Sequence, residues 1–429
     1  MMVIIYERKM IMDYMPILKD VCLALTILLA VCYAYQIVYM LVPLIKKRKK
    51  LPQASQKKYA ILIAARNEEA VLPYLLDSIA HQDYPKELVT TYVVADNCTD
   101  GTAQAARAHG ARVFERFNRV KIGKGYALNY LLGRIREEAG WDAYDAFLIF
   151  DADNLLQPNY ITEINKVRGA GFEAFCGYRN TKNFGTNWLS SGYGVWYLHD
   201  STHMNQSRMM LGTSCAVSGT GFGFTSQLLE KMGGWKFFTL TEDLEFNTWC
   251  VTHGIKIGYS QDAVIYDEQP FDFRQSWRQR TRWTQGGVQI VGRYTGALAR
   301  GLFQGGWASY ATFETSTLTM WGCALSTFTG ILTALTAYLA RGWGGLGFML
   351  LVRLVGGYLS AMVMGALTVA MEWKHIAASR KMKILSVFAF PVFMLTFIPI
   401  SLTAVFRKFQ WQPTAHTVAI SSKALSENS

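Results

Sequence analysis

The chain has 429 residues, of which 51% are hydrophobic and 14% aromatic, and its formal net charge at pH 7 is +12. A mean hydropathy of +0.12 is too high for an ordinary soluble enzyme and too low for a protein made only of membrane helices. We therefore expect a soluble domain attached to membrane helices. Much of the basic charge lies in short clusters beside apolar segments, which is typical of a cytosolic membrane surface and argues against nucleic-acid binding.

The first apolar segment, residues 21–44, carries no charge and is long enough to cross a bilayer of about 30 Å as a helix. The run KKRKK follows it at 46–50, and positive charge of this kind marks the cytosolic side of a membrane. Residues 1–50 are therefore predicted to form a transmembrane helix with a basic flank, with the N-terminus outside and the following domain in the cytosol. The seven cysteines form no C-x-x-C pair, so neither a disulfide framework nor a zinc site is expected.

Residues 51–286 alternate between strand and helix patterns, which predicts an α/β domain with a mostly parallel sheet covered by helices. Strands are predicted at 59–65, 89–95, 111–115, 146–150 and 172–176, and helices at 68–79, 102–109, 126–138, 159–168, 242–253 and 274–291. Residues 183–224 are rich in Gly, Ser and aromatic residues, and their periodicity predicts little.

After this domain the chain returns to the membrane. Residues 287–310 are expected to form an interfacial amphipathic helix, and residues 311–408 to hold three transmembrane helices, at 315–339, 346–371 and 384–405. A tail follows at 409–429. Three crossings place the C-terminus outside, whereas Arg407 and Lys408 favour the inside. A re-entrant or split last segment would place the C-terminus inside.

The stretch AFLIFDADN at 146–154 is the main candidate for a ligand-binding site. Five apolar residues form a run of strand length, and Asp151 and Asp153 follow at its end. Ligands of open α/β sheets bind outside the carboxyl ends of the strands, and two carboxylates there suit a divalent cation that also holds the phosphates of a nucleotide. Taken alone, the tripeptide Asp-Ala-Asp favours two solvated loop acids, and the rest of the chain reverses that preference.

Two further acidic sites follow the same logic. Asp96 ends the second predicted strand and could accept hydrogen bonds from a nucleobase or ribose, although Asn97 or Thr99 could instead cap a helix there. Glu242 and Asp243 follow Thr241, which is a common arrangement at a helix N-terminus. A carboxylate held there near a metal and a substrate could instead act as a general base.

The pentapeptide Gln279-Arg280-Thr281-Arg282-Trp283 is the fourth element. Guanidinium groups bind phosphate oxygens and could neutralise a departing diphosphate, while an indole face could support a sugar ring. A basic helix entering the membrane interface explains the same residues. Lys124, between two glycines, could also reach phosphate, but one lysine in a Gly-rich loop is a weak signal.

The order of these motifs resembles that of the membrane-bound family-2 glycosyltransferases, which include cellulose, chitin-oligosaccharide, hyaluronan and poly-N-acetylglucosamine synthases and, nearby, ceramide glucosyltransferases. The resemblance covers residues 58–290. It rests on Ala64-Ala65-Arg66-Asn67-Glu68, Asp96, Asp151-Ala152-Asp153, Thr241-Glu242-Asp243 and Gln279–Trp283. The expected membrane helices on either side extend it.

The resemblance implies a GT-A fold and a nucleotide-sugar donor, usually a UDP-sugar. Donor-binding residues would be Ala65, Arg66, Glu68, Asp96, Lys124, Asp151, Gln279, Arg280 and Arg282. Asp153, with Asp151, would hold Mg²⁺ or Mn²⁺. Asp243 would be the catalytic base with Glu242 beside it, and Thr241 and Trp283 would face the acceptor. A single in-line displacement would invert the anomeric centre and give a β-linked product.

The leading interpretation is a processive polysaccharide synthase in the cell membrane that extends its product at the cytosolic face and exports it. The alternative is transfer of one sugar to a lipid acceptor. A transporter or scaffold with a degenerate domain is disfavoured because all the motif acids are present. Two departures leave the donor sugar and processivity open. Residues 209–224 match no single subfamily, and no counterpart of the F-x-V-T-x-K gating loop of cellulose synthases is found.

Overall fold

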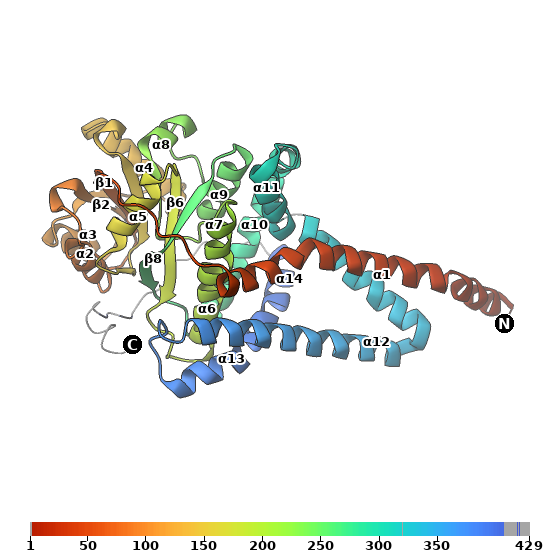
Figure 1. The fold of residues 1–429 in the computed structure, drawn as a ribbon. Coiled ribbons are helices and arrows are strands. Elements are labelled where there is room, and N and C mark those ends of the chain that lie inside the picture. Colours follow the sequence, from red (N-terminus) through yellow and green to blue (C-terminus); the bar gives the residue numbers. More distant parts are fainter. Residues whose placement is uncertain (1, 320, 407–417, 419, 421–429) are drawn as a thin grey trace.

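A computed structural model describes all residues except 1, 320, 407–417, 419 and 421–429. It consists of an α/β domain from which long helices extend to one side (Figure 1). The domain contains one eight-stranded sheet. Its strands are β1 (Tyr59–Ala65), β2 (Val89–Asp96), β3 (Arg112–Arg116), β4 (Ala146–Asp151), β5 (Leu155–Leu156), β6 (Ala174–Thr181), β7 (Phe222–Thr225) and β8 (Ile257–Asp267).

The strand order is β3-β2-β1-β4-β7-β6-β8-β5. Strands β1 to β4 are parallel, β7 is antiparallel to both β4 and β6, β8 is parallel to β6, and β5 is antiparallel to β8. The sheet is therefore mostly parallel, as predicted.

Helices cover both faces of the sheet. The domain helices are α2 (Leu72–Ala80), α3 (Thr102–Ala108), α4 (Lys124–Glu138), α5 (Tyr160–Gly169), α6 (Trp188–His199), α7 (Gln206–Leu211), α8 (Ser226–Met232), α9 (Glu242–Thr252), α10 (Phe273–Gly301) and α11 (Gly306–Thr319), with short helices at Lys86–Leu88, Trp141–Ala143 and Asp200–Asn205. Helices α2, α3 and α5 pack on one face, and α4, α6, α8 and α9 on the other.

Alternation along the central strands explains these two layers. In β1, Ala60 and Leu62 join one core cluster, whereas Tyr59, Ile61 and Ile63 join the other, and all five are fully buried. Successive side chains of a strand point to opposite faces, so a strand covered on both faces reads as a continuous apolar run. This is why the apolar runs of β1 and β4 predicted buried strands correctly.

The structure adds elements that the sequence pattern did not predict. Strands β5 and β7 are too short to show a period, and β8 has an irregular register at Gly177/Tyr178 of its partner β6. The segment at 183–224 contains helix α6, a π-helical turn at Asp200–Asn205 and helix α7, which follow one another without a break. Its glycines and aromatic residues have weak helix propensity, and burial against the sheet overrides that preference.

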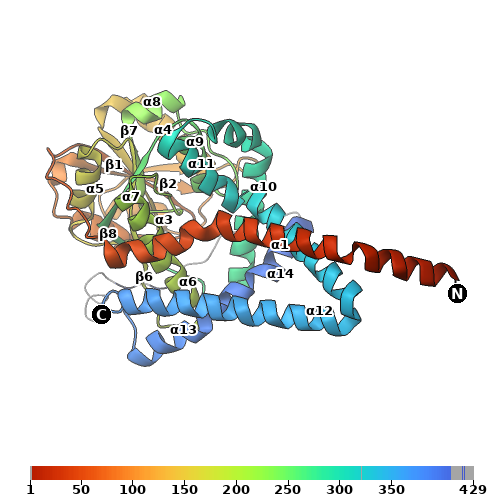
Figure 2. The ribbon, with the colours of Figure 1, turned by 45° about the vertical axis from the view of Figure 1, so that its right-hand side comes forward.

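Among the described residues, three helical segments are long and apolar enough to cross a membrane: Asp13–Ile45, Trp321–Met371 and Arg380–Ala404. They belong to α1 (Met2–Ile45), α12 (Trp321–Met371), and α13 (Arg380–Leu395) followed by α14 (Phe397–Phe406). In both views α1 and α12 extend from the domain side by side (Figures 1 and 2).

Helix α12 is interrupted near its middle. Arg341 and Gly342 have non-helical backbone angles, and the helix runs out from the domain and returns to it (Figure 1). The break lies between the two spans expected at 315–339 and 346–371. The first arm begins at Trp321 and not at residue 315, because α11 ends at Thr319 as a separate helix.

The last apolar segment is also divided. Helix α13 ends at Leu395 and α14 begins at Phe397. Farther along, the backbone oxygen of Val418 accepts a hydrogen bond from Lys182 Nζ (2.9 Å), and its N–H donates to Glu268 Oε2 (2.9 Å). Val418 therefore lies against the α/β domain. Apart from Val418 and Ile420, the expected tail at 409–429 lies outside the described residues, as do Arg407 and Lys408.

Helix α10 differs from the expectation in one respect. It runs unbroken over 29 residues, so it crosses the domain boundary that was expected at residue 286. The amphipathic segment predicted from residue 287 onward is the second half of this helix. Gln285 in its middle donates a hydrogen bond to the backbone oxygen of Ala404 in α14 (2.9 Å). The domain and the apolar C-terminal segment therefore share this helix.

Candidate active site

Three strand ends bring the first group of predicted residues together. Strand β1 lies between β2 and β4, and its register pairs Ala65 with Ala95 and Ala64 with Asp151. Asp96 follows Ala95 directly, so Ala65, Asp96 and Asp151 meet at the carboxyl edge of the sheet. This is the edge at which open α/β sheets bind ligands.

Asp96 is buried at one side of this edge. Its Oδ1 accepts hydrogen bonds from a guanidinium nitrogen of Arg116 and from Asn97 Nδ2 (3.1 Å). Burial raises the pKa of Asp96 despite the opposing charges of Arg116 and Arg66. Arg116, on β3, was not predicted, because nothing in the sequence shows that β3 lies beside β2.

The loops after β1 and β2 are held in fixed shapes. Asn67 and Asn97 have positive φ angles of 57° and 55°, a conformation that Asn tolerates better than most residues. Asn67 Oδ1 accepts from the N–H of Thr99, and Asn97 Oδ1 from the N–H of Asn118, both at 2.8 Å. The N–H of the buried Glu68 donates to the hydroxyl of the first residue of α3 (2.8 Å). Glu68 thus helps to fix the loop that follows Arg66.

Lys124 lies between two of the predicted acids. Its Nζ is 2.5 Å from Asp151 Oδ1, 2.8 Å from the backbone oxygen of Gly219 and 3.7 Å from Glu242 Oε1. Burial lowers the pKa of Lys124, but the carboxylates of Asp151 and Glu242 outweigh this effect and raise it above its usual value. The weak sequence signal at Lys124 therefore marks a central cation of the cluster.

Glu242 begins α9 and is buried. Burial raises its pKa to about 7; the charge of Asp243 acts in the same direction, while Lys124 and Arg282 oppose it. A carboxyl whose pKa is higher in the folded than in the unfolded protein stabilises the fold at low pH, and this contribution is lost as the pH rises through the folded value.

Substituting Glu242→Gln should therefore change the pH dependence of stability. Between pH 4.5 and about 7, the wild-type protein should lose stability relative to the variant as Glu242 ionises. Thermal unfolding of both proteins in detergent across this range measures the difference. The exposed Glu137→Gln variant is the matched control and should run parallel to the wild type. Parallel curves for Glu242→Gln would show that Glu242 ionises normally in the folded protein.

Gly219 lies next to three charged side chains of the cluster, those of Lys124, Arg179 and Asp243. Its φ is +85°, and a Cβ at this position would lie 3.5 Å from Arg179 Nη1 and 3.8 Å from Asp243 Oδ2. The space would accept a Cβ, but the positive φ angle favours glycine. Asp243, Arg179 and Lys124 meet around this residue, which belongs to the 209–224 segment.

Asp153 lies deeper than Asp151. It is buried, and its Oδ2 accepts a hydrogen bond from the N–H of Glu268 (2.7 Å). Within the described residues no group of three or more His, Cys, Asp or Glu side chains is arranged to hold a metal. Asp151 and Asp153 nevertheless offer carboxylate oxygens, the ligands that Mg²⁺ and Mn²⁺ prefer, and a bound diphosphate would supply further oxygens. These residues fit a metal that binds together with the nucleotide.

The side chains of the α10 pentapeptide point in two directions. Arg282 Nη1 donates to the backbone oxygen of Leu240 (3.1 Å), and its charge acts on Glu242. Gln279 Oε1 is buried and accepts no hydrogen bond from the described residues. Trp283 packs edge-on against Tyr193 of α6, with ring centroids 6.0 Å apart. Arg282 therefore joins the acidic group that begins α9.

Arg280 does not join this group. Its side chain is fully buried, and Nη1 donates to Thr396 Oγ1 (2.7 Å) and to the backbone oxygen of Phe393 (3.3 Å). The guanidinium carbon lies 4.8 Å from the ring centroids of both Phe393 and Phe397. The structure thus places this predicted donor-binding residue at the break between α13 and α14, because it points to a different side of α10 from Arg282.

Thr241 also has a packing role. A Cβ on Gly286 would lie only 2.2 Å from Thr241 Oγ1. Only glycine lets α10 approach the start of α9 this closely, and the Thr241 side chain faces the backbone of α10. Its predicted place on the acceptor side therefore has a structural alternative.

Other residues of the cluster were not predicted. Arg179 Nε donates to Asp267 Oδ2 (2.7 Å), and the guanidinium carbon lies 3.7 Å from the ring centroid of Tyr197. Burial and the charge of Asp153 raise the pKa of Asp267 to about 6, although Arg179 lowers it. Lys182 Nζ donates to the backbone oxygen of Asp153 (2.8 Å). A sequence signal existed, since polar residues at the ends of β6 and β8 follow the same pattern as Asp151.

Comparisons with known proteins find relatives among enzymes that make glycolipids and polysaccharides. A beta-monoglucosyldiacylglycerol synthase of Synechocystis sp. is 27% identical over 53% of this chain and 47% of its own length. A poly-beta-1,6-N-acetyl-D-glucosamine synthase of Staphylococcus epidermidis is 24% identical over 54% of this chain and 55% of its own. The chain thus spans about half the length of the curated relatives it matches.

The mannosyltransferase PcManGT of Pyrobaculum calidifontis, solved with GDP-Man and Mn²⁺, has a similar fold. Its TM-score is 0.52 at 17% identity, and the match covers 91% of this chain and 99% of that one. Residues 56–286 match the model of the family described as "Glycosyltransferase like family 2". These residues contain the sheet, the acidic cluster at its carboxyl edge and the pentapeptide of α10. The chain therefore belongs to the family-2 glycosyltransferases, as its motifs predicted.

Proposed function

We propose that this glycosyltransferase transfers one sugar from a nucleotide-sugar donor to the hydroxyl group of a lipid acceptor. One observation carries this proposal. Helix α10 contributes Arg282 to the acidic cluster and, two residues earlier, Arg280 to the break between the apolar helices α13 and α14. An acceptor anchored in the membrane would therefore reach the cluster along a helix that already contacts both.

The donor would lie across the carboxyl edge of the sheet. Ala65, Arg66 and Asp96 would hold the nucleoside, because a buried carboxylate in rigid loops can accept hydrogen bonds from a base or ribose. A UDP-sugar is the donor class that the resemblance favours. Lys124 and Arg282 are the cations nearest to the acids of the cluster, and they would bind the diphosphate.

Asp151 and Asp153 would hold Mg²⁺ or Mn²⁺ beside the diphosphate. The metal would supply positive charge to the oxygens of the leaving group. Glu268 fixes the orientation of Asp153 through its backbone N–H, and Lys124 pairs with Asp151. The chain thus holds both carboxylates in place before the donor arrives.

Asp243 would be the general base. The acceptor oxygen attacks the anomeric carbon as its proton passes to the Asp243 carboxylate, and the bond from that carbon to the diphosphate oxygen breaks. The electron pair of this bond leaves with the nucleoside diphosphate, whose charge Arg282 and Lys124 stabilise. One displacement of this kind inverts the anomeric centre.

The α/β domain would lie on the cytosolic side of the membrane. The basic run at 46–50 follows α1, and a second basic group lies at 374–383 beside the return of α12 to the domain. Both mark the domain side as cytosolic by the positive-inside rule.

A processive polysaccharide synthase is the second candidate, favoured by the similarity to poly-N-acetylglucosamine synthase. Export of a polymer requires helices that enclose a polar path. In the most apolar 18-residue window of α12 no residue is buried, which suits a helix surrounded by lipid better than the wall of a channel. For this reason the lipid acceptor is proposed first.

Transfer from labelled donors would separate the two candidates. The full chain in detergent, with Mn²⁺ or Mg²⁺ and membrane lipid extract, would be incubated with radiolabelled nucleotide-sugars, including UDP-glucose and UDP-N-acetylglucosamine. We expect label in the organic phase that depends on added lipid. Label in a high-polymer fraction without added lipid would instead establish the polysaccharide synthase, and label in neither fraction would contradict both proposals.

A further inference from the structure

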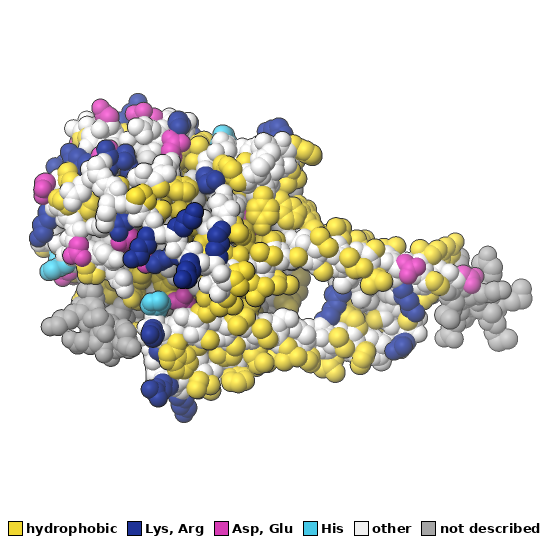
Figure 3. Space-filling model, in the orientation of Figure 1, with side chains coloured by type: hydrophobic (Ala, Val, Ile, Leu, Met, Phe, Trp, Pro, Cys, Tyr) yellow, Lys and Arg dark blue, Asp and Glu magenta, His cyan; other side chains and the backbone are white. Residues whose placement is uncertain are grey.

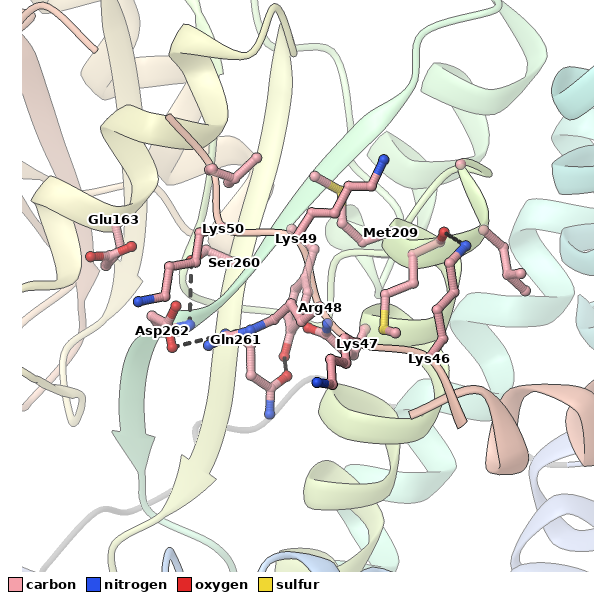
Figure 4. A pocket seen from close by; sticks show the side chains of 16 residues that line it. Lys46, Lys47, Arg48, Lys49, Lys50, Glu163, Met209, Ser260, Gln261 and Asp262 are labelled. Atoms are coloured by element: carbon pink, nitrogen blue, oxygen red, sulfur yellow. Dashed lines mark hydrogen bonds and ion pairs between the residues drawn. The ribbon is translucent and has the colours of Figure 1, made fainter. Parts of the chain in front are cut away.

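A cavity of about 430 Å³ lies where α1 meets the α/β domain (Figure 4). It contains none of the residues assigned to the reaction. Its walls come from the segment that follows α1, from the end of α7, and from the middle of β8, with Glu163 of α5 at one side. This pocket, the α1 pocket, is lined by Lys46–Leu51, Glu163, Gln206, Met209–Gly212 and Tyr259–Asp262.

The α1 pocket is strongly basic. Five cationic side chains and two acidic ones line it, which leaves a formal excess of three positive charges. Two of the five cationic side chains already have partners within the chain. Lys46 Nζ donates to the backbone oxygen of Met210 (2.7 Å), and Arg48 pairs with Asp262 (2.8 Å). Lys47, Lys49 and Lys50 make no hydrogen bond or ion pair with the described residues, so three ammonium groups remain for a ligand.

The position of the pocket relative to the membrane is defined by α1. This helix ends at Ile45, directly before the basic residues, and the side chain of Ile45 is 80% exposed. The last turns of an apolar spanning helix meet the headgroup layer, so the lysines that follow lie at the depth of lipid phosphates. A group of Lys and Arg side chains accordingly lies at the boundary between the domain and the apolar helices (Figure 3).

One wall of the pocket is apolar. Met209, Met210 and Leu211 line it, and Leu211 is 47% exposed. A site for inorganic phosphate would need only the cations. A wall of flexible apolar side chains beside the cations instead fits a ligand that has an anionic head and a hydrocarbon body.

From these observations we propose that the α1 pocket binds the phosphate headgroup of an anionic glycerophospholipid from the cytosolic leaflet. Lys47, Lys49 and Lys50 extend in different directions from the segment that follows α1 (Figure 4), and these flexible side chains supply the positive charge that holds the phosphate. Met209–Leu211 contact the glycerol and the first methylene groups. The site ties the domain to the membrane beside α1. It does not depend on which sugar or acceptor the enzyme uses.

The test uses the full chain in a neutral detergent and a short-chain lipid, dioctanoyl phosphatidylglycerol, with binding measured by native mass spectrometry and by titration. The variant Lys47→Gln/Lys49→Gln/Lys50→Gln should bind this lipid about 100-fold more weakly than the wild type, at roughly fivefold per lysine. A matched variant, Lys374→Gln/Arg380→Gln/Lys381→Gln, removes three charges from the other basic group and should bind like the wild type.

Further measurements separate the possible sources of the signal. The triple Lys→Arg variant at 47, 49 and 50 should keep binding, and zwitterionic dioctanoyl phosphatidylcholine should bind poorly to every protein. Equal competition by inorganic phosphate at the same concentration would assign the pocket to free phosphate and overturn the lipid assignment. Equal losses in both triple Gln variants would show charge attraction without a site, and no binding to the wild type would also overturn the proposal.

Discussion

Asp243→Asn is expected to lower the turnover number for sugar transfer by about 10³-fold, because an amide cannot accept the proton of the acceptor hydroxyl. Binding of UDP should stay within about threefold of the wild-type value, since the cations proposed to hold the diphosphate are unchanged. Asn has nearly the same shape as Asp, so the start of α9 should remain intact. Single-turnover transfer and isothermal titration with UDP measure the two quantities.

The matched control for this experiment is Asp77→Asn on α2. The Asp77 side chain is 61% exposed, and its one ion pair, with His109, is 3.7 Å long. This variant should transfer sugar at the wild-type rate. Wild-type turnover in Asp243→Asn would assign the base to another group, and Glu242, whose pKa is raised to about 7, would be the next residue to test.

The second large effect is expected at Arg282. Arg282→Gln should lower the turnover number by about 10² to 10³, because it removes a charge that would stabilise the leaving diphosphate. It also removes one hydrogen bond, to the backbone oxygen of Leu240, so the loss of unfolding free energy should be only about 1 kcal/mol. Steady-state kinetics and thermal unfolding in detergent measure the two effects.

Arg280→Met is the control that the structure offers for this prediction. Met has a similar length and an apolar side chain, and the site is already walled by Phe393 and Phe397. Arg280 pairs with no carboxylate among the described residues, so its replacement leaves no opposite charge unpaired in the protein. Turnover should therefore stay within about threefold of the wild type. A loss equal to that of Arg282→Gln would show that both arginines act on the diphosphate.

These two arginines also show what a motif in a sequence can and cannot predict. A helix turns by about 100° per residue, so side chains two positions apart point about 160° away from each other. The resemblance assigned Arg280 and Arg282 the same role because they share a pentapeptide. Their separation follows from helix geometry, but which side of α10 faces the acids depends on how the helix packs against α9 and α14, and no local pattern encodes that.

The acids, in contrast, were predictable from local sequence. Asp96 and Asp151 each follow an apolar run that is buried on both faces, and the ends of neighbouring parallel strands meet at one edge. Asp267 follows the same rule at the end of β8, but that strand was not predicted. Its apolar pattern is interrupted at Gln261 and Asp262, where the pairing with β6 is irregular. Arg179, which pairs with Asp267, was missed with it.

The division of the last apolar segment into two helices could not be predicted from hydropathy alone. Residues 384–405 form an apolar stretch long enough for one crossing, and hydropathy does not mark the division between α13 and α14. Pro399 does mark it, because it lies in the first turn of α14 and has no N–H to donate to the backbone oxygen of Leu395, where α13 ends. The buried Arg280, which donates to Thr396 at that division, comes from a helix more than 100 residues earlier in the chain. A long-range contact of this kind is outside the reach of a sliding window.

The reversal of α12 at Arg341 and Gly342 has a consequence for biosynthesis. The first arm of the hairpin leaves from the domain, and the second returns to it. In the proposed orientation, and among the described residues, the polar chain carried to the far side of the bilayer would be limited to this short turn and the start of α1. Two apolar helices joined by such a turn could enter the membrane together, so in the proposed orientation the folded catalytic domain would not have to be translocated.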